Sequence, residues 1–288
     1  MYLPTAYNPA AAGEDDLMRV AGLHRMQFTG IKNAPMTTYF LFSSPFVIGK
    51  TRHAAGVRFL NDRFGLFSNQ ALHAQYAYRM RVGNGTLAIG TDLGFVNISF
   101  AYDSVNLGRL SADYFQQSDE AIPQGQGGNG MTFDLGAGIW YSAPTWWVSA
   151  SMSHLTFPTL QWSDKSEFHL KGTMYLAGGY NWRLRNRDWV LKPSAMVMTD
   201  FAGWDVNIAM MAELKEKYRF GLSYRILGNV GLILGMDIIS GLQIGYTYEL
   251  PTSKLIYESY GSHEIYLAYG FDILRPKRTN RYKSVRYL

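Results

Sequence analysis

The sequence contains no cysteine, which excludes disulfides, thiolate metal sites and cysteine nucleophiles. Charged residues are scarce at 17% of the 288 residues, below the share in an average soluble protein. A long apolar run is also missing, because the longest stretch without a charged residue, 135–163, is interrupted by Pro144 and Pro158. A transmembrane helix needs about 20 predominantly apolar residues in succession, so a helical membrane protein is disfavoured.

Aromatic and apolar residues are abundant instead. Aromatic residues make up 15% of the chain and hydrophobic residues 47%, with 20 tyrosines and 29 glycines. The mean hydropathy of −0.12 is nevertheless near neutral, so polar residues must be interleaved with the apolar ones. This combination calls for an apolar solvent or a very large core.

Apolar and polar residues alternate with period two at near-regular intervals along the chain. In the last such segment Ile265, Leu267 and Tyr269 share one face, whereas Glu264 and Ala268 share the other. A soluble sandwich also alternates, but an apolar face opposite a mixed polar one is typical of a transmembrane barrel. We predict an all-β fold, a transmembrane antiparallel β-barrel of about 14 strands, at 17–28, 36–48, 54–62, 69–82, 86–100, 131–143, 145–156, 168–184, 189–200, 205–216, 218–227, 229–239, 241–250 and 263–273.

The links between these strands alternate in length. Tight links such as Gly83-Asn84-Gly85, Pro144 and Asn186-Arg187-Asp188 join strands 2–3, 4–5, 6–7, 8–9, 10–11 and 12–13. The links that alternate with these include the three longest in the chain, 101–130, 157–167 and 251–262. Outer-membrane barrels have short periplasmic turns and longer external loops. The parity therefore predicts that both termini are periplasmic.

Five tryptophans fall near predicted strand ends, where amphipathic rings favour the membrane interface. We expect them to form one girdle: Trp140, Trp146, Trp147, Trp182 and Trp189.

In the long link 101–130, glycines cluster at 125–130. They follow neither a strand nor a helix start in phosphate-loop register, so a flexible surface loop or a partner-binding loop is favoured over a nucleotide site.

The two chain ends differ from the body. Residues 1–13 lack the basic and apolar regions of a signal peptide, and because a barrel must be exported we infer that a signal was removed or is absent from this numbering. At the other end six basic residues without an acid account for more than the formal charge of +5, namely Arg275, Lys277, Arg278, Arg281, Lys283 and Arg286. This tail is interpreted either as a solvated terminus or as a docking site for a periplasmic protein partner, and not as a nucleic-acid site.

A catalytic or metal site is not indicated. His263 and Glu264 are adjacent, but neighbouring residues of a strand point to opposite faces, so a structural or rim hydrogen-bonding role is favoured. The six histidines show no metal-ligand spacing such as i, i+4. We expect no enzyme activity, no cofactor and no metal.

Short motifs spread over the chain resemble the PorP/SprF family of type IX secretion proteins. The sequence Tyr7-Asn8-Pro9-Ala10-Ala11-Ala12-Gly13 is similar to the family's Asn-Pro-Ala-Tyr-Ala-Gly motif, with Ala11 in place of the usual Tyr. Gly261-Ser262-His263-Glu264-Ile265, which opens the last predicted strand, is the most specific match. Further matches follow in the expected order, among them Asn61–Gly65, Tyr76–Arg79, Phe133–Gly138, Ser223–Arg225 and Gly245–Tyr248.

The resemblance implies an outer-membrane component of the type IX system of Bacteroidota. Its expected partners are a secreted cargo or gliding adhesin with a C-terminal secretion domain, other components of the system such as periplasmic lipoproteins, and outer-membrane lipid. Cargo would contact loops 101–130, 157–167 and 251–262 or a plugged lumen. The alternative is a diffusion channel or hydrophobic-solute transporter.

Three regions are expected, namely an N-terminal periplasmic or plug segment (1–16), the barrel (17–274) and the basic periplasmic tail (275–288). Asn8 and Pro9 precede the first predicted strand. The segment is interpreted either as a structural lead-in or as a plug that occupies the lumen, in which Asn8 would supply amide hydrogen bonds to strand ends and Pro9 would stiffen the turn.

Overall fold

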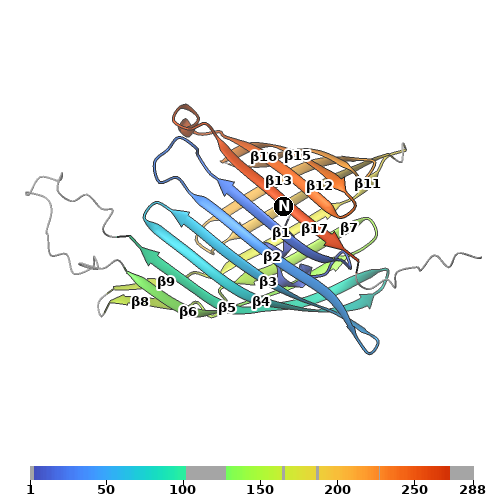
Figure 1. The fold of residues 1–288 in the computed structure, drawn as a ribbon, viewed down its shortest axis with the longest axis horizontal. Coiled ribbons are helices and arrows are strands. Elements are labelled where there is room, and N and C mark those ends of the chain that lie inside the picture. Colours follow the sequence, from blue (N-terminus) through green and yellow to red (C-terminus); the bar gives the residue numbers. More distant parts are fainter. Residues whose placement is uncertain (1–2, 102–127, 164–165, 186–187, 227, 273–288) are drawn as a thin grey trace, which may run out of the picture.

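The structure, a computed structural model, is a closed antiparallel β-barrel of 14 strands (Figure 1). It describes residues 3–101, 128–163, 166–185, 188–226 and 228–272. The wall strands are β1 (Met18–Met26), β2 (Met36–Ile48), β3 (Thr51–Phe64), β4 (Phe67–Val82), β5 (Gly85–Phe100), β6 (Asn129–Ser142), β7 (Trp146–Ser153), β10 (Thr173–Tyr180) with its short continuation β11 (Trp182–Arg183), β12 (Trp189–Thr199), β13 (Trp204–Leu214), β14 (Tyr218–Arg225), β15 (Asn229–Ile239), β16 (Leu242–Pro251) and β17 (Ser262–Phe271).

Consecutive wall strands pair with each other, and the barrel closes between the first strand and the last. Met18 of β1 lies opposite Phe271 of β17, and the pairing continues to Met26 opposite His263. Closure leaves no open sheet edge, which is the condition for strands to cross a bilayer, because every backbone polar group then finds a partner within the wall. The predicted fold class is confirmed.

The outer face of the wall is apolar along every long strand. In β15, for example, Val230, Leu232 and Leu234 are exposed on the outside, whereas Ile233 is buried inside. The strands predicted at 69–82 and 205–216 show the same alternation, since Leu72, Ile208 and Met210 are exposed. Side chains that are apolar and exposed over the whole circumference fit a lipid environment.

The links sort by end as predicted. At one end the fully described links are short, and residues 49–50, 83–84, 143–145, 215–217 and 240–241 suffice to reverse the chain. Residues 186–187 of the predicted tight link Asn186-Arg187-Asp188 lie outside the described residues. Gly83 adopts a φ of +59° in its two-residue turn, a conformation that glycine reaches without steric cost. The opposite end carries the long links, including 252–261 with the 3-10 helix η5 (Lys254–Tyr257). Residues 102–127 of the longest link lie outside the described residues.

One predicted strand is wrong in its extent. We expected a strand at 168–184 after a loop at 157–167, but the wall strand β10 begins at Thr173 and the preceding residues form a separate hairpin of β8 (Thr159–Ser163) and β9 (Ser166–His169). Leu160 of this hairpin is buried with Ala71, Val96 and Ile98, which face inward on β4 and β5. Tertiary packing against the inner wall therefore turns residues 166–169 away from the sheet.

The predicted tryptophan girdle is also wrong in part. Trp140 is 3% exposed and stacks inside the barrel on Trp147, with ring centroids 4.6 Å apart. Trp146 and Trp182 are exposed outside, as expected. Because successive side chains of a strand point to opposite faces, Trp146 and Trp147 cannot both reach lipid.

Helices of the described residues are all too short or too polar to cross a membrane.

Candidate functional site: an N-terminal segment inside the barrel

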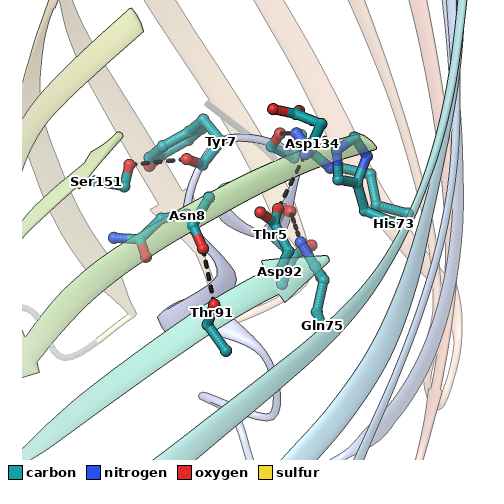
Figure 2. Close-up of polar contacts among 12 residues, drawn as sticks. Thr5, Tyr7, Asn8, His73, Gln75, Thr91, Asp92, Asp134 and Ser151 are labelled. Carbon is teal, nitrogen blue, oxygen red and sulfur yellow. Dashed lines mark hydrogen bonds and ion pairs between the residues drawn. The ribbon is translucent and has the colours of Figure 1, made fainter. Parts of the chain in front are cut away.

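Residues 3–16 run along the inner wall of the barrel (Figure 2). They form two 3-10 turns, η1 (Pro4–Ala6) and η2 (Pro9–Ala11), each with a proline at its start, where the fixed φ of proline suits the turn. The second turn contacts β4, β5 and β6. Ala10, Ala11 and Ala12 are buried against the wall, since their small side chains allow a close approach of the two backbones.

Asn8 connects this segment to two wall strands. Its side chain is fully buried, and its amide nitrogen lies 3.0 Å from the carbonyl oxygen of Ile139 in β6 and 3.4 Å from that of Ala150 in β7. Its Oδ1 accepts a 2.9 Å hydrogen bond from the backbone N–H of Ala10. One side chain therefore caps η2 and holds the turn against the wall. The carbonyls that it reaches lie within the strands and not at their ends.

Side chains of the wall donate to the backbone of the segment. The guanidinium of Arg58 lies 2.7 Å from the carbonyl oxygen of Ala6, and the hydroxyl of Ser151 lies 2.7 Å from that of Tyr7 (Figure 2 shows the second contact). Gln75 donates to Thr5 at 3.0 Å and Arg79 to Glu14 at 3.1 Å. Carbonyl groups that would otherwise be buried without a partner are thus satisfied.

Two glycines of the wall make room for the segment. A Cβ atom added to Gly90 in β5 would overlap the backbone of Ala10, and one added to Gly138 in β6 would overlap the side chain of Asn8. The N-terminal segment lies directly over both glycines. Only a residue without a side chain fits at these two positions while the segment stays in place.

Buried charges underlie the segment. Arg58 forms a 2.9 Å ion pair with Asp92, and the two side chains are 9% and 3% exposed. Asp134 of β6 lies 2.9 Å from Nε2 of His73 in β4 and 2.8 Å from Nδ1 of His154, which begins the link after β7. His154 adopts a positive φ of 58°, an uncommon conformation for a side-chain-bearing residue. Asp134 thus joins two wall strands to the base of the link that carries the β8–β9 hairpin.

The polar groups of this region anchor the N-terminal segment to the wall. Burial, with the carboxylate of Glu14 as a smaller cause, raises the pKa of the Tyr7 phenol, so Tyr7 is neutral at physiological pH and its ring lies 5.8 Å from that of Tyr175. Within the described ranges no three His, Asp or Glu side chains are placed to hold a metal ion.

The other side of the lumen is hollow. Cavities there are lined by inward-facing residues of β1 and β12–β17, and one of them also borders the N-terminal segment at Pro4 and Glu14. Charged side chains of these strands are paired with each other. Lys192 lies 2.9 Å from Glu213, and Arg25 lies 2.7 Å from Glu249. The N-terminal segment therefore fills mainly the part of the lumen beside β4–β6, although Leu3 also packs on β1, β2 and β17.

The motif at the last strand is divided between the two faces of the wall. Gly261 has a φ of +83°, and the hydroxyl of Ser262 accepts a 3.1 Å hydrogen bond from the N–H of Phe28. His263 points outward, where its ring nitrogen lies 2.7 Å from the Tyr246 hydroxyl. Glu264 points inward and lies 3.4 Å from Arg25. The structure keeps the histidine and the carboxylate apart.

The remaining predicted sites are partly outside the described residues. Asn8, Pro9, Ala10 and Gly13 all lie in the internal segment. The six basic residues from Arg275 to Arg286 and most of the 101–130 link are not described. Sequence reasoning missed the wall residues that hold the segment, although the alternation along residues 69–82 places Gln75 and Arg79 on one polar face.

The family model of type IX secretion system membrane proteins PorP/SprF matches residues 1–269. Among solved structures the chain is similar to the outer membrane protein Omp33 of Acinetobacter baumannii, with a TM-score of 0.50 and 7% identity over 88% of this chain and 97% of that one. It also matches the toluene transporter TodX of Pseudomonas putida, with a TM-score of 0.48 and 11% identity over 92% of each chain. The likeness to Omp33 shows the fold alone. A search of curated proteins found no match.

Proposed function

Because this chain belongs to the PorP/SprF family of type IX secretion system membrane proteins, we propose that it docks a specific secreted protein for export or surface attachment. Membership and the barrel fold make it an outer-membrane component of that system. The finer proposal is a non-enzymatic docking role, with a cargo or adhesin that carries a C-terminal secretion domain as the partner.

The observation that carries the proposal is the occupied lumen. Residues 3–16 are bound to the wall through the side chains of Asn8, Arg58, Gln75 and Ser151, and the β8–β9 hairpin packs inside the wall near the other end. A barrel that commits part of its interior to its own chain is poorly suited to bulk diffusion. This supports a plug role for the N-terminal segment and directs a partner to the surface.

A candidate docking surface lies at the end with the long links. The links 27–35 and 252–261 join there, because the N–H of Tyr260 donates to the carbonyl of Thr29 at 2.8 Å. Tyr257 and Tyr260 are 85% and 79% exposed, and Leu255 and Ile256 beside them are also exposed. Tyrosine on a protruding apolar surface is favoured in protein interfaces. We place this end outside the cell and both termini in the periplasm.

The test is affinity purification of the tagged chain from detergent-solubilised envelopes. We expect the wild type to recover a secreted protein with a C-terminal secretion domain, and the double variant Ile256→Ser with Tyr257→Ser to lose it. The matched control is Tyr180→Ser, an exposed tyrosine near the opposite end. Equal recovery with all three chains would show that this surface is not the docking site.

The basic tail is a second proposed contact, on the periplasmic side. Its six residues Arg275, Lys277, Arg278, Arg281, Lys283 and Arg286 offer charge for an acidic protein partner. Replacing all six with Gln should reduce export of the cargo while the barrel still inserts. Export at the wild-type rate would contradict a docking role for the tail.

The hollow half of the lumen favours one alternative, a diffusion channel. Its paired charges, such as Lys192 with Glu213, would suit a water-filled path. Planar bilayer recordings separate the two functions: a closed or barely conducting barrel supports docking, whereas a stable open conductance in the wild type supports the channel.

A further inference from the structure

The strand β6 continues past its neighbour β7 at the end of the barrel with the long links. On one side β6 stays paired with β5 as far as Asn129. On its other side the pairing with β7 stops at Ala137, and β7 itself ends at Ser153. Up to that level the wall is closed. Beyond it residues 129–134 of β6 form the margin of the sheet, over about 20 Å at roughly 3.4 Å per residue.

The chain that follows β7 turns inward instead of continuing alongside β6. The N–H of Leu155 donates a last 2.9 Å hydrogen bond to the carbonyl of Leu135. His154 and Phe157, on either side of this contact, have positive φ values of 58° and 46°. The chain then forms the β8–β9 hairpin, which packs on the inner faces of β4 and β5 at the same end of the barrel (Figure 1). Although β8 lies near β6, its described residues pair with β9.

Alternate residues of β6 direct their backbone groups toward the side that β7 has left. Successive residues of an antiparallel strand bond to opposite neighbours. The carbonyl of Gly128 accepts from Phe100 of β5, whereas that of Leu135 accepts on the β7 side. Met131 and Phe133 share the parity of Leu135, so their N–H and C=O groups point away from β5. Among the described residues none pairs with these backbone groups.

This side of residues 129–133, which we call the free edge, lacks the features that usually protect a sheet margin. Natural edges are blunted by lysine, proline or bulges. Residues 129–133 read Asn-Gly-Met-Thr-Phe and pair with β5 without a register shift. Met131 and Phe133 are 70% and 47% exposed on the outer face. Unpaired donors and acceptors beside exposed apolar side chains form an acceptor for another strand.

We propose that the free edge binds an extended strand of the secreted partner, which adds to the sheet beside β6. This inference rests on the docking function proposed above and names one contact that performs it. Donors and acceptors repeat along the edge every two residues, about 7 Å, a spacing that another β-strand matches, and about five residues fit. Side chains opposite each other in a sheet share a face, so the partner's residues opposite Met131 and Phe133 are apolar. The edge lies at the same end as the exposed link 252–261.

Hydrogen exchange of the purified chain, measured by NMR, tests the edge without any partner. The N–H groups of Thr132 and Asp134 bond to β5, whereas those of Met131 and Phe133 do not. We expect the latter two to exchange roughly a hundredfold faster, because exchange of a paired N–H requires local opening of the sheet. Equal protection of all four would overturn the proposal whether or not the chain docks a secreted protein.

Photocrosslinking in cells tests what binds the edge. The benzophenone amino acid p-benzoylphenylalanine replaces Phe133 or, as the matched control, Phe40, which is 59% exposed on β2 but has a paired strand on both sides. We expect position 133 to crosslink to an extended segment of the secreted protein that co-purifies with the wild type, and position 40 to give no such adduct.

The outcomes of this experiment separate the edge from the docking function. An adduct with a second copy of the chain would overturn the proposal, as would no adduct at position 133 while the secreted protein still co-purifies, and both leave the docking function standing. If no secreted protein co-purifies with the wild type, the docking function fails and this inference fails with it.

The variant Met131→Pro tests the backbone contact by itself. Proline removes one N–H of the free edge but no bond to β5, and proline is tolerated at sheet edges. The adduct at position 133 should fall at least about threefold, since one hydrogen bond is worth roughly a factor of two to ten. Met131→Leu, which keeps the N–H, should retain the adduct, and heat-modifiable migration on gels verifies that both barrels are folded. Equal adducts in the two variants would contradict strand addition.

Discussion

The side-chain amide of Asn8 donates a 3.0 Å hydrogen bond to the backbone carbonyl of Ile139, a residue 131 positions away in the sequence. Through this bond and a second one to Ala150, a short turn before the first strand is attached to the centre of the wall. The segment thereby fills one side of the lumen and leaves cavities beside β12–β17.

Replacing Asn8 by Ala should release the N-terminal segment. The change removes two bonds to the wall and the cap of η2, and a buried hydrogen-bond partner of this kind contributes about 1–3 kcal/mol. Hydrogen exchange of residues 3–16 should become faster, with the wall strands unchanged. Asn84→Ala, in an exposed turn, is the control, and equal exchange in the two variants would show that Asn8 does not hold the segment.

Gly138→Ala should displace the segment by a different route. The added Cβ would overlap the Asn8 side chain, and the segment can move away more cheaply than the closed sheet can. We expect a folded barrel with increased conductance in planar bilayers. In Gly22→Ala, where the nearest atom is 3.7 Å from the added Cβ, conductance should stay at the wild-type value. A wild-type conductance for Gly138→Ala would argue against the plug.

Asp134→Ala should loosen the link that carries the β8–β9 hairpin. The substitution removes the hydrogen-bonding partner of both His73 and His154, and leaving a buried polar group without its partner costs about 1–3 kcal/mol. Exchange in residues 154–163 should rise more than exchange in β12–β17. Asp237→Ala, which removes a carboxylate from the hollow half, should leave the hairpin unchanged; a rise in both variants would indicate general destabilisation.

Leu160→Ala tests whether the hairpin is held by its apolar contact. Leu160 is 1% exposed and packs on Val96 and Ile98, so truncation should lower the free energy of local opening by about 2–5 kcal/mol. Limited proteolysis should then cut the hairpin in the variant. Phe157→Ala serves as control because Phe157 is 57% exposed, and resistance of Leu160→Ala to the protease would contradict the packing argument.

Much of the barrel could be predicted from local pattern. The expected strand at 229–239 coincides with β15, and the inward positions of His73, Gln75 and Arg79 follow from alternation alone. The hairpin at 159–169 was missed because its two strands are short and leave no long periodic signal. Trp140 was assigned to the lipid interface from its place near a strand end, yet the parity of its position turns it inward beside Trp147.

By itself the sequence determined the alternation of faces, the short and long ends of the barrel and the family. These are local properties, because the direction of a strand side chain depends only on its position in the pleat. The tertiary structure alone decided that Asn8 meets Ile139, that Arg58 and Asp92 lie beneath the segment, and that Arg225 and Glu264 face one cavity. Those meetings depend on how the sheet closes and on its register, which bring together residues that no local pattern relates.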